Sequence, residues 1–247
     1  MTLYLIGLGL SDEKDISIKG LEIIKRCDTI FLESYTSKLD CKVSDLEELY
    51  KKKVIVADRN LIENSLNKIL DSAKKQEVAI LIIGDVFSAT THINILLECK
   101  NMGVRVNVIH NASILTAIGE IGLDVYKFGR TISIPLENKD VKSPVKFLKD
   151  NLRLGLHTLI LLDCVPLENK FLDINLAVDY LIMNGLKEST DAIGCSALGS
   201  DKFKSIYTDL KRLKKEKFRK FPQCIVIPGK LHFIEKEMLE SWKIKDC

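Results

Sequence analysis

Runs of consecutive apolar residues alternate with segments of helical apolar spacing through the first half of the chain. Strands are expected at residues 3–8, 29–32, 53–57, 78–83 and 104–109. Helices are expected between them, at residues 17–26, 43–50, 61–74 and 93–100. Continuous apolar strands separated by helices are typical of a parallel sheet that is covered on both faces. The first half of the chain therefore predicts an α/β domain.

The pattern changes after Ser113, where glycine and proline interrupt the chain as far as Pro135. Strands are expected at residues 131–134, 157–162, 192–197 and 223–227, and helices at 143–154, 175–183 and 233–242. We place a domain boundary near residues 113–118. This predicts an N-terminal α/β domain of residues 1–113 and a C-terminal α/β domain of residues 114–247.

The composition is that of an ordinary globular protein. Of the 247 residues, 46% are apolar and 29% are charged, and 37 basic residues nearly balance 34 acidic ones for a net charge of +3. This balance does not indicate nucleic-acid binding. No apolar run approaches the roughly 18 residues of a membrane span, and no basic leader precedes the apolar N-terminus. We expect no nucleic-acid or membrane partner and a cytoplasmic location.

One dense charge cluster, at residues 211–220, is typical of a solvated helix face and loop. A docking patch for an acidic partner is the less favoured interpretation of this cluster.

Neither the cysteines nor the histidines show the spacing of a metal site. The seven cysteines are scattered and include no Cys-x-x-Cys pair, so we expect reduced cysteines that pack as small apolar side chains. The four histidines, His92, His110, His157 and His232, lack His-x-x-x-His spacing, which favours structural hydrogen bonding. We therefore predict no metal site and assign no catalytic residue.

A strand-to-helix junction at residues 80–92 carries the densest set of small hydrogen-bonding groups. The apolar run ends in Gly84-Asp85, and hydroxyl residues follow before helical spacing resumes at Ile93. A second such junction, at residues 104–113, follows one βαβ unit later. Open parallel sheets bind small ligands at the carboxyl ends of their strands, so the pattern predicts a ligand site. Helix capping by Asp85 or Ser88 is a compatible alternative.

The segment Gly7–Asp12 resembles the start of a dinucleotide-binding fingerprint but lacks its third glycine. A pyrophosphate there would face Asp12, Glu13 and Asp15, where a dinucleotide site needs unoccupied amides. A cationic ligand without phosphate, such as one with a sulfonium group, is compatible with these carboxylates. The alternative is a tight turn in which glycine supplies a positive φ.

The lack of a motif for proton transfer fits methyl transfer from a sulfonium. That reaction is an in-line displacement on an activated donor, and it needs an unprotonated nucleophile held at about 3 to 3.5 Å. Strand-end backbone and small polar loops suit this requirement.

Seven segments spread over the chain match one known family, and the most specific contain Tyr35-Thr36-Ser37, Ala89-Thr90-Thr91-His92 and Asn111-Ala112-Ser113-Ile114. The segments lie at residues 3–16, 31–37, 56–59, 84–92, 108–114, 157–163 and 228–232. With them, the chain resembles the diphthine synthase family, the methyltransferases of diphthamide biosynthesis within the tetrapyrrole methylase fold group.

This resemblance implies two tetrapyrrole methylase-like α/β domains, with a mostly parallel sheet in the first, a mixed sheet in the second and a ligand cleft between them. It implies S-adenosyl-L-methionine as cofactor, a homodimer, and elongation factor 2 as protein substrate, at a histidine that carries an aminocarboxypropyl group. The family's cofactor positions correspond to Leu10, Asp85, Ser88, Ser113, Ile114, Leu162, Leu198 and His232. Tyr35, Thr36 and Ser37 are candidate contacts of the substrate.

The chain departs from the family pattern in the loop 84–92, where Val86 stands in place of a common proline and Ser88 in place of a glycine. Ser11 also replaces a common glycine, and the region 163–191 is shorter than in many members. Two alternative functions stay open: a precorrin-type tetrapyrrole methyltransferase, and a non-catalytic scaffold with this fold.

Overall fold

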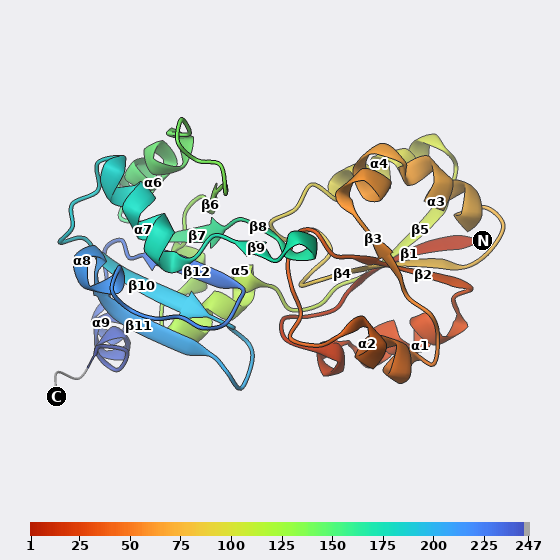
Figure 1. The fold of residues 1–247 in the computed structure, drawn as a ribbon, viewed down its shortest axis with the longest axis horizontal. Helices are drawn as coiled ribbons and strands as arrows, with labels where there is room; N and C mark the ends of the chain where they lie inside the picture. Colours follow the sequence, from red (N-terminus) through yellow and green to blue (C-terminus); the bar gives the residue numbers. More distant parts are fainter. Residues whose placement is uncertain (245–247) are drawn as a thin grey trace. The chain divides into compact units, whose positions relative to one another are not determined.

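A computed structural model describes residues 1–244, which fold as two compact units. The first unit comprises Met1–Leu115, and the second begins at Thr116 (Figure 1). Among the described residues, no helix is both long and apolar enough to cross a membrane.

The first unit is built on a five-stranded parallel sheet. Its strands are β1 (Thr2–Gly7), β2 (Thr29–Glu33), β3 (Ile55–Ala57), β4 (Val78–Ile82) and β5 (Arg105–Ile109). They lie in the order β3-β2-β4-β1-β5, and every pair is parallel. The helices are α1 (Ile18–Arg26), α2 (Val43–Tyr50), α3 (Leu66–Ala73) and α4 (Ile93–Asn101), with short helical turns η1 (Glu13–Asp15) and η2 (Asn60–Asn64).

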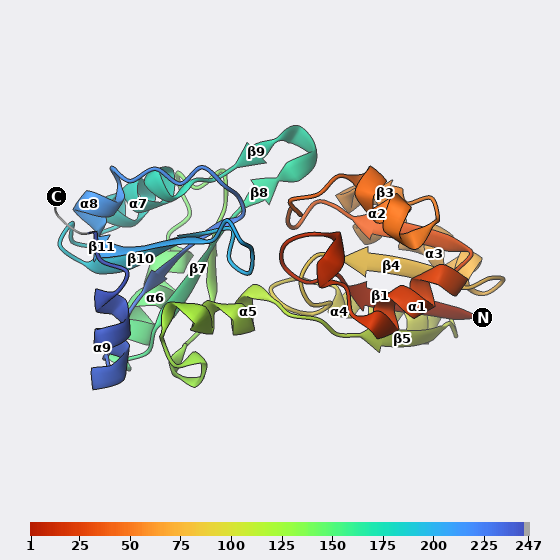
Figure 2. The same ribbon diagram turned by 90° about the horizontal axis from the view of Figure 1, so that it is seen from below.

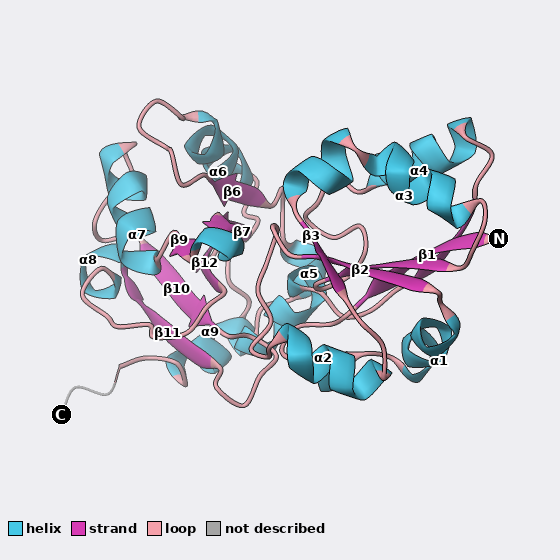
Figure 3. Cartoon of the chain, turned by 45° about the vertical axis from the view of Figure 1, so that its right-hand side comes forward, coloured by secondary structure: helices cyan, strands magenta, loops and turns pink. Residues whose placement is uncertain are grey.

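Helices cover both faces of this first sheet. Figure 1 shows α3 and α4 on one face and α1 and α2 on the other, and Figure 3 shows how strands alternate with helices. Each face has its own apolar core, one beneath α3 and α4 and one beneath α1 and α2. All five residues of β4 are buried, as its unbroken apolar run predicts.

The second unit contains a five-stranded mixed sheet. Its strands are β6 (Ile132–Ile134), β7 (Thr158–Leu162), β10 (Asp191–Ser196), β11 (Lys204–Asp209) and β12 (Gln223–Ile227). They lie in the order β11-β10-β12-β7-β6, and only the β6–β7 pair is parallel. The strands β8 (Cys164–Val165) and β9 (Lys170–Phe171), joined through η5 (Pro166–Glu168), form a separate hairpin (Figure 2).

The helices of the second unit pack mainly around one large apolar core. They are α6 (Ser143–Arg153), α7 (Ile174–Met183), α8 (Leu210–Leu213) and α9 (Phe233–Glu240), with the short turns η3 (Ile118–Ile121) and η4 (Val125–Lys127). Side chains of α6, α7 and α8 join those of the sheet in this core. The short helix α5 (Ile114–Ala117) lies where the first unit ends and the second begins.

The predicted fold class, a parallel α/β sheet followed by a mixed one, is confirmed. The predicted helix at 61–74 differs in detail, because its first part is the π-helical turn η2 and α3 begins only at Leu66. Ser65 lies between them with non-helical angles (φ −125°, ψ 22°), and this interrupts a pattern whose apolar spacing is continuous.

The described cysteines are all free, and five of these six are buried, as expected for small apolar side chains. The seventh, Cys247, lies outside the described residues. In the charge cluster at 211–220, Leu213 is buried whereas Lys211, Lys214 and Lys215 are exposed. The solvated helix face predicted for this segment is therefore present in α8.

Candidate functional site

Three loops that follow neighbouring strands lie together at the carboxyl edge of the first sheet. They follow β4, β1 and β5, which are consecutive in the sheet order. Because the strands are parallel, all three loops leave the sheet at the same edge. Leu10, Asp85, Ser88, Ser113 and Ile114 belong to these loops or to the helix start directly after them, so the first unit brings five predicted site residues to one edge.

Glycines allow the loops after β1 and β4 to make direct backbone contact. Gly9 and Gly84 exchange hydrogen bonds, with N···O distances of 3.2 and 2.7 Å, and both have a positive φ, of 86° and 81°. A Cβ atom on Gly7 would lie only 2.7 Å from the carbonyl oxygen of Gly84. The tight turn with positive φ that the sequence predicts is therefore present at Gly9.

The carboxylate of Asp15 occupies the amides that a phosphate would need. Its Oδ2 accepts the backbone N–H groups of Leu10 and Ser11 at 3.0 and 2.6 Å. Asp12 accepts the N–H of Lys14 at 2.9 Å in the same turn. An anionic ligand would have to displace one carboxylate and approach another, so this turn does not suit a pyrophosphate.

The side chain of Asp85 is a junction of four hydrogen bonds. Oδ1 accepts the N–H of Phe87 at 3.2 Å and the hydroxyl of Ser88 at 3.4 Å. Oδ2 accepts the N–H of Asn111 at 3.1 Å and lies 2.8 Å from Nδ1 of His110. Burial raises the pKa of Asp85, but the bonds from His110, Phe87 and Asn111 outweigh it and hold the pKa below its usual value.

The alternative role predicted for this loop, capping of the next helix, is not observed. The N-cap of α4 is His92, which makes no side-chain capping bond within the described residues. Asp85 instead closes a local turn onto Phe87. Ser88 tolerates the place of a family glycine because the positive φ angles of the loop, 81° and 58°, fall on Gly84 and Ala89.

Asn111 is a site residue that the sequence reasoning missed. Its Nδ2 donates to the carbonyl oxygens of Gly7 and Asp15, both at 3.0 Å, and its Oδ1 accepts the N–H of Ala112 at 2.7 Å. It thus ties the end of β1, the η1 turn and the end of β5 together. An asparagine two residues after the end of a strand was the available signal, but its partners depend on which strands are neighbours.

Ser113 is buried and lies near Gly84. A Cβ atom built on Gly84 would lie 4.0 Å from the Cβ of Ser113, which is an ordinary contact distance. Ile114 begins α5 directly after it.

In the second unit, two of the three predicted site residues share an edge of the sheet. Leu162 ends β7, and Leu198 follows β10. Both strands are antiparallel to β12, so they run in the same direction, and their carboxyl ends pair with the beginning of β12 at Gln223 and Cys224. Leu162 and Leu198 therefore lie at the edge where β12 begins.

The third predicted site residue, His232, lies beyond the opposite edge of that sheet, after the end of β12. The end of β12, Ile227, pairs with Thr158 at the start of β7. A five-residue strand of about 16 Å separates this end from Leu162. The backbone N–H of His232 donates to the carboxylate of Glu235 at 2.7 Å at the start of α9.

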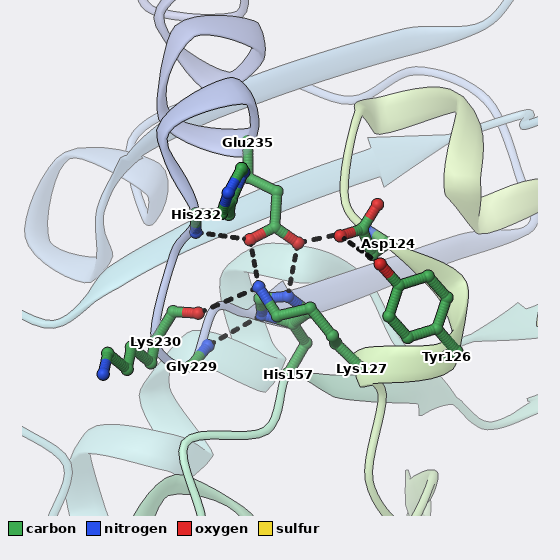
Figure 4. Close-up of polar contacts among 8 residues, drawn as sticks. All are labelled: Asp124, Tyr126, Lys127, His157, Gly229, Lys230, His232 and Glu235. Carbon is green, nitrogen blue, oxygen red and sulfur yellow. Dashed lines mark hydrogen bonds and ion pairs between the residues drawn. The ribbon is translucent and has the colours of Figure 1, made fainter.

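The exposed residue His232 contributes its backbone N–H to a polar cluster around the buried carboxylate of Glu235 (Figure 4). Besides His232, this carboxylate accepts the backbone N–H of Asp124 at 3.1 Å and pairs with Nζ of Lys127 and with Nε2 of His157 at 3.0 Å. Burial raises the pKa of Glu235, but these donors outweigh it and lower the pKa to about 2.

The protonation state of His157 follows from its two partners. Nδ1 accepts the backbone N–H of Gly229 at 2.9 Å, so the ring proton resides on Nε2 and is donated to Glu235. Burial lowers the pKa of His157, which keeps the ring neutral. The expectation that the histidines serve as structural hydrogen-bonding groups fits His157 and also His110, which contacts Asp85.

Comparison with known proteins decides the family. The model of the tetrapyrrole (corrin/porphyrin) methylases matches residues 2–214. The chain belongs to this family. As a tetrapyrrole methylase, it is 37% identical to the diphthine methyl ester synthase of Homo sapiens, over 99% of this chain and 96% of that protein. It is also 37% identical to the diphthine synthase of Methanococcus maripaludis, over 96% and 97% of the two chains.

A solved structure of diphthine synthase has the same fold as this tetrapyrrole methylase. It superposes with a TM-score of 0.92 at 35% identity and covers 98% of this chain and 96% of that one. The family resemblance inferred from the seven sequence segments is confirmed, and with it the enzyme class, a methyltransferase.

Proposed function

We propose that this tetrapyrrole methylase is a diphthine synthase, which transfers methyl groups from S-adenosyl-L-methionine to the modified histidine of elongation factor 2. Relatives named for that reaction match it over nearly their whole length, and this similarity supports the choice of acceptor. The observation that carries the choice of donor is the carboxylate of Asp15 on the amides of Leu10 and Ser11. A donor without phosphate fits this turn.

The residues at the carboxyl edge of the first sheet fit such a donor. Leu10, Ser88 and Ile114 would supply backbone and apolar contacts, and Asp85 and Ser113 would supply polar ones. S-adenosyl-L-methionine, when bound, supplies a methyl group on a positively charged sulfur. The carboxylates of Asp15 and Asp85 give this edge a negative potential, which favours a cation. Leu162 and Leu198 complete the set that we propose. We leave His232 out of it, because this residue follows the opposite edge of their sheet.

In this reaction the protein contributes mainly by binding and orienting the acceptor, because the methyl donor is already activated. The acceptor nitrogen must reach the loops unprotonated and in line with the bond that breaks. The Tyr35–Ser37 turn after β2 is our candidate for that contact. No residue needs to act as a strong acid in this scheme, which agrees with the absence of such a motif from the sequence.

The decisive experiment supplies labelled S-adenosyl-L-methionine with elongation factor 2 that carries the aminocarboxypropyl histidine. We expect label on the elongation factor, and mass spectrometry counts the methyl groups. The count matters because the relatives named diphthine synthase and diphthine methyl ester synthase are equally similar to this chain. Methylation of a precorrin and not of the elongation factor would refute the proposal, and no binding of the cofactor or of S-adenosylhomocysteine would favour a scaffold.

We also propose that the protein works in the cytoplasm as a homodimer, as the resemblance to its family implies. Light scattering after size-exclusion chromatography tests the dimer, for which twice the chain mass of 27.9 kDa is the expected result.

A further inference from the structure

A second buried polar cluster lies at the carboxyl edge of the first sheet, on β2. Its centre is Glu33, the last residue of that strand, which is completely buried. Oε1 accepts the backbone N–H groups of Tyr35 and Thr36 at 2.7 and 2.9 Å, and Oε2 accepts the hydroxyl of Thr36 at 2.5 Å. Burying a carboxylate is costly unless such donors surround it, so Glu33 determines the shape of the turn that follows β2.

This cluster joins the ends of three adjacent strands, β3, β2 and β4. The hydroxyl of Tyr35 lies 3.5 Å from Nε2 of His92, and Oε2 of Glu33 lies 3.8 Å from the same nitrogen. Arg59, which follows β3, places its guanidinium carbon 5.2 Å from the centre of the Tyr35 ring. Tyr35 and His92 are both buried, with 6% and 2% of their surfaces exposed. Burial lowers the pKa of His92, against the effect of Glu33, so this ring is held neutral.

The loop 84–92 is therefore anchored at its two ends by two different clusters. At its start, Asp85 bonds to Asn111 and His110 beyond β5. At its end, His92 contacts Tyr35 and Glu33 beyond β2. The proposed cofactor residues Asp85 and Ser88 lie near the first anchor, and the candidate acceptor turn Tyr35–Ser37 lies at the second.

We propose that Glu33 is a positioning residue for methyl transfer, which holds the Tyr35–Ser37 turn against His92 and so sets where the acceptor stands relative to the loop 84–92. The inference rests on the proposed methyltransferase function and on contact between this turn and the acceptor. Glu33 itself touches neither reactant. Because an in-line displacement is sensitive to shifts of about 1 Å, a loosened turn lowers the rate. The affinity for the cofactor is retained, since the anchor at Asp85 is separate.

The test compares Glu33→Gln with the wild-type protein. The glutamine keeps the size of the side chain and one acceptor oxygen, but its amide group cannot accept the hydroxyl of Thr36. We expect the single-turnover rate to fall by about tenfold to a hundredfold, while the Kd for S-adenosylhomocysteine changes by less than about twofold. Thr36→Val removes the hydroxyl bond to Glu33 but keeps the backbone bonds of the turn, and it lowers the rate less. Glu48→Gln, on the exposed side of α2, is the matched control and leaves the rate and the Kd unchanged.

A readout independent of activity is the ¹⁵N NMR signal of the His92 ring, which we expect to shift in Glu33→Gln and not in Glu48→Gln. An unchanged rate in Glu33→Gln overturns the inference, as does a fall in rate matched by an equal fall in affinity for S-adenosylhomocysteine. If Glu33→Gln does not fold, the single-turnover rate, the Kd for S-adenosylhomocysteine and the His92 signal are measured in Thr36→Val and judged by the same criteria. Failure of the wild-type protein to bind S-adenosylhomocysteine would instead overturn the proposed function.

Discussion

The carboxylate of Asp85 accepts the backbone N–H of Asn111 at 3.1 Å, and this bond joins the end of β4 to the end of β5 across β1, which lies between them. The side chain of Asn111 then donates to the carbonyl oxygen of Gly7 at the end of β1. Three neighbouring strand ends are thus held in one network. The proposed cofactor loops are positioned by these bonds as well as by their own local turns.

Asp85→Ala should weaken both the cofactor site and the fold. The substitution leaves the N–H groups of Phe87 and Asn111 without their acceptor, so we expect the free energy of unfolding to fall by about 1–3 kcal/mol. We expect the Kd for S-adenosylhomocysteine to rise about tenfold, which corresponds to about 1.4 kcal/mol. Urea unfolding and calorimetry measure the two effects.

The control for this substitution is Asp71→Ala, since Asp71 lies on the exposed side of α3 and its carboxylate pairs with Nζ of Lys74 at 3.1 Å on the surface. Asp71→Ala should leave both the free energy of unfolding and the Kd for S-adenosylhomocysteine nearly unchanged. The sequence alone favours a site role for Asp85 without a role in stability, because a loop carboxylate seldom supports a core. An unaltered affinity in Asp85→Ala would remove Asp85 from the proposed site.

Gly84→Ala and Gly103→Ala separate backbone strain from an effect on the site. Both glycines have a positive φ, of 81° and 66°, so each alanine should cost about 1–2 kcal/mol of stability. A Cβ atom meets nothing within 4 Å at Gly103, whereas at Gly84 it approaches Ser113 and Ala112. Only Gly84→Ala should therefore weaken the binding of S-adenosylhomocysteine. Equal affinities in the two variants would show that the space beside Ser113 is not used.

Strongly periodic or continuous apolar segments allowed most of the fold to be predicted from the sequence. The bounds of α2 and β12 agree with the predicted ranges, because each has clear apolar spacing and distinct ends. The strand β11 was missed. It is an edge strand in which only Ile206 and Tyr207 are buried, so its apolar pattern is too short to recognise. The two-residue strands β8 and β9 give no pattern at all.

Only the part of the candidate site that depends on residues close together in the sequence could be predicted. Polar loops after strands can be recognised in the sequence, and Asp85 and Ser113 are proposed as site residues on that basis. The bonds of Asn111 to Gly7 and of His92 to Tyr35 join residues 104 and 57 positions apart. The first bond exists because β5 lies beside β1, and the second because β4 lies beside β2. The sequence does not state that order. The edge of the second sheet at which His232 lies could not be predicted either, since it depends on the direction of β12.

The buried carboxylate of Glu235 should make the free energy of unfolding depend on pH in the acid range. Its pKa is about 2 in the folded protein, below the ordinary value of 4.5, so the unfolded chain binds more protons between these values. Glu235 therefore contributes stability above pH 4.5, and this contribution disappears as the pH falls towards about 2. The shift corresponds to about 3 kcal/mol. Urea unfolding of the wild type and of Glu235→Gln over this range should show a difference that shrinks as the pH falls. A difference independent of pH would contradict the assignment.

The final prediction tests the three candidate cofactor positions in the second unit. If Leu162 and Leu198 contact the cofactor at the edge where β12 begins, then Leu162→Ala and Leu198→Ala should each raise the Kd for S-adenosylhomocysteine by about fivefold to tenfold, because each removes apolar surface from the bound cofactor. His232→Ala should leave that Kd unchanged, because the bond of this residue to Glu235 uses its backbone N–H. Calorimetry on the three variants, each checked for an intact fold by circular dichroism, provides the comparison. A weaker affinity confined to His232→Ala would return His232 to the site and exclude both leucines.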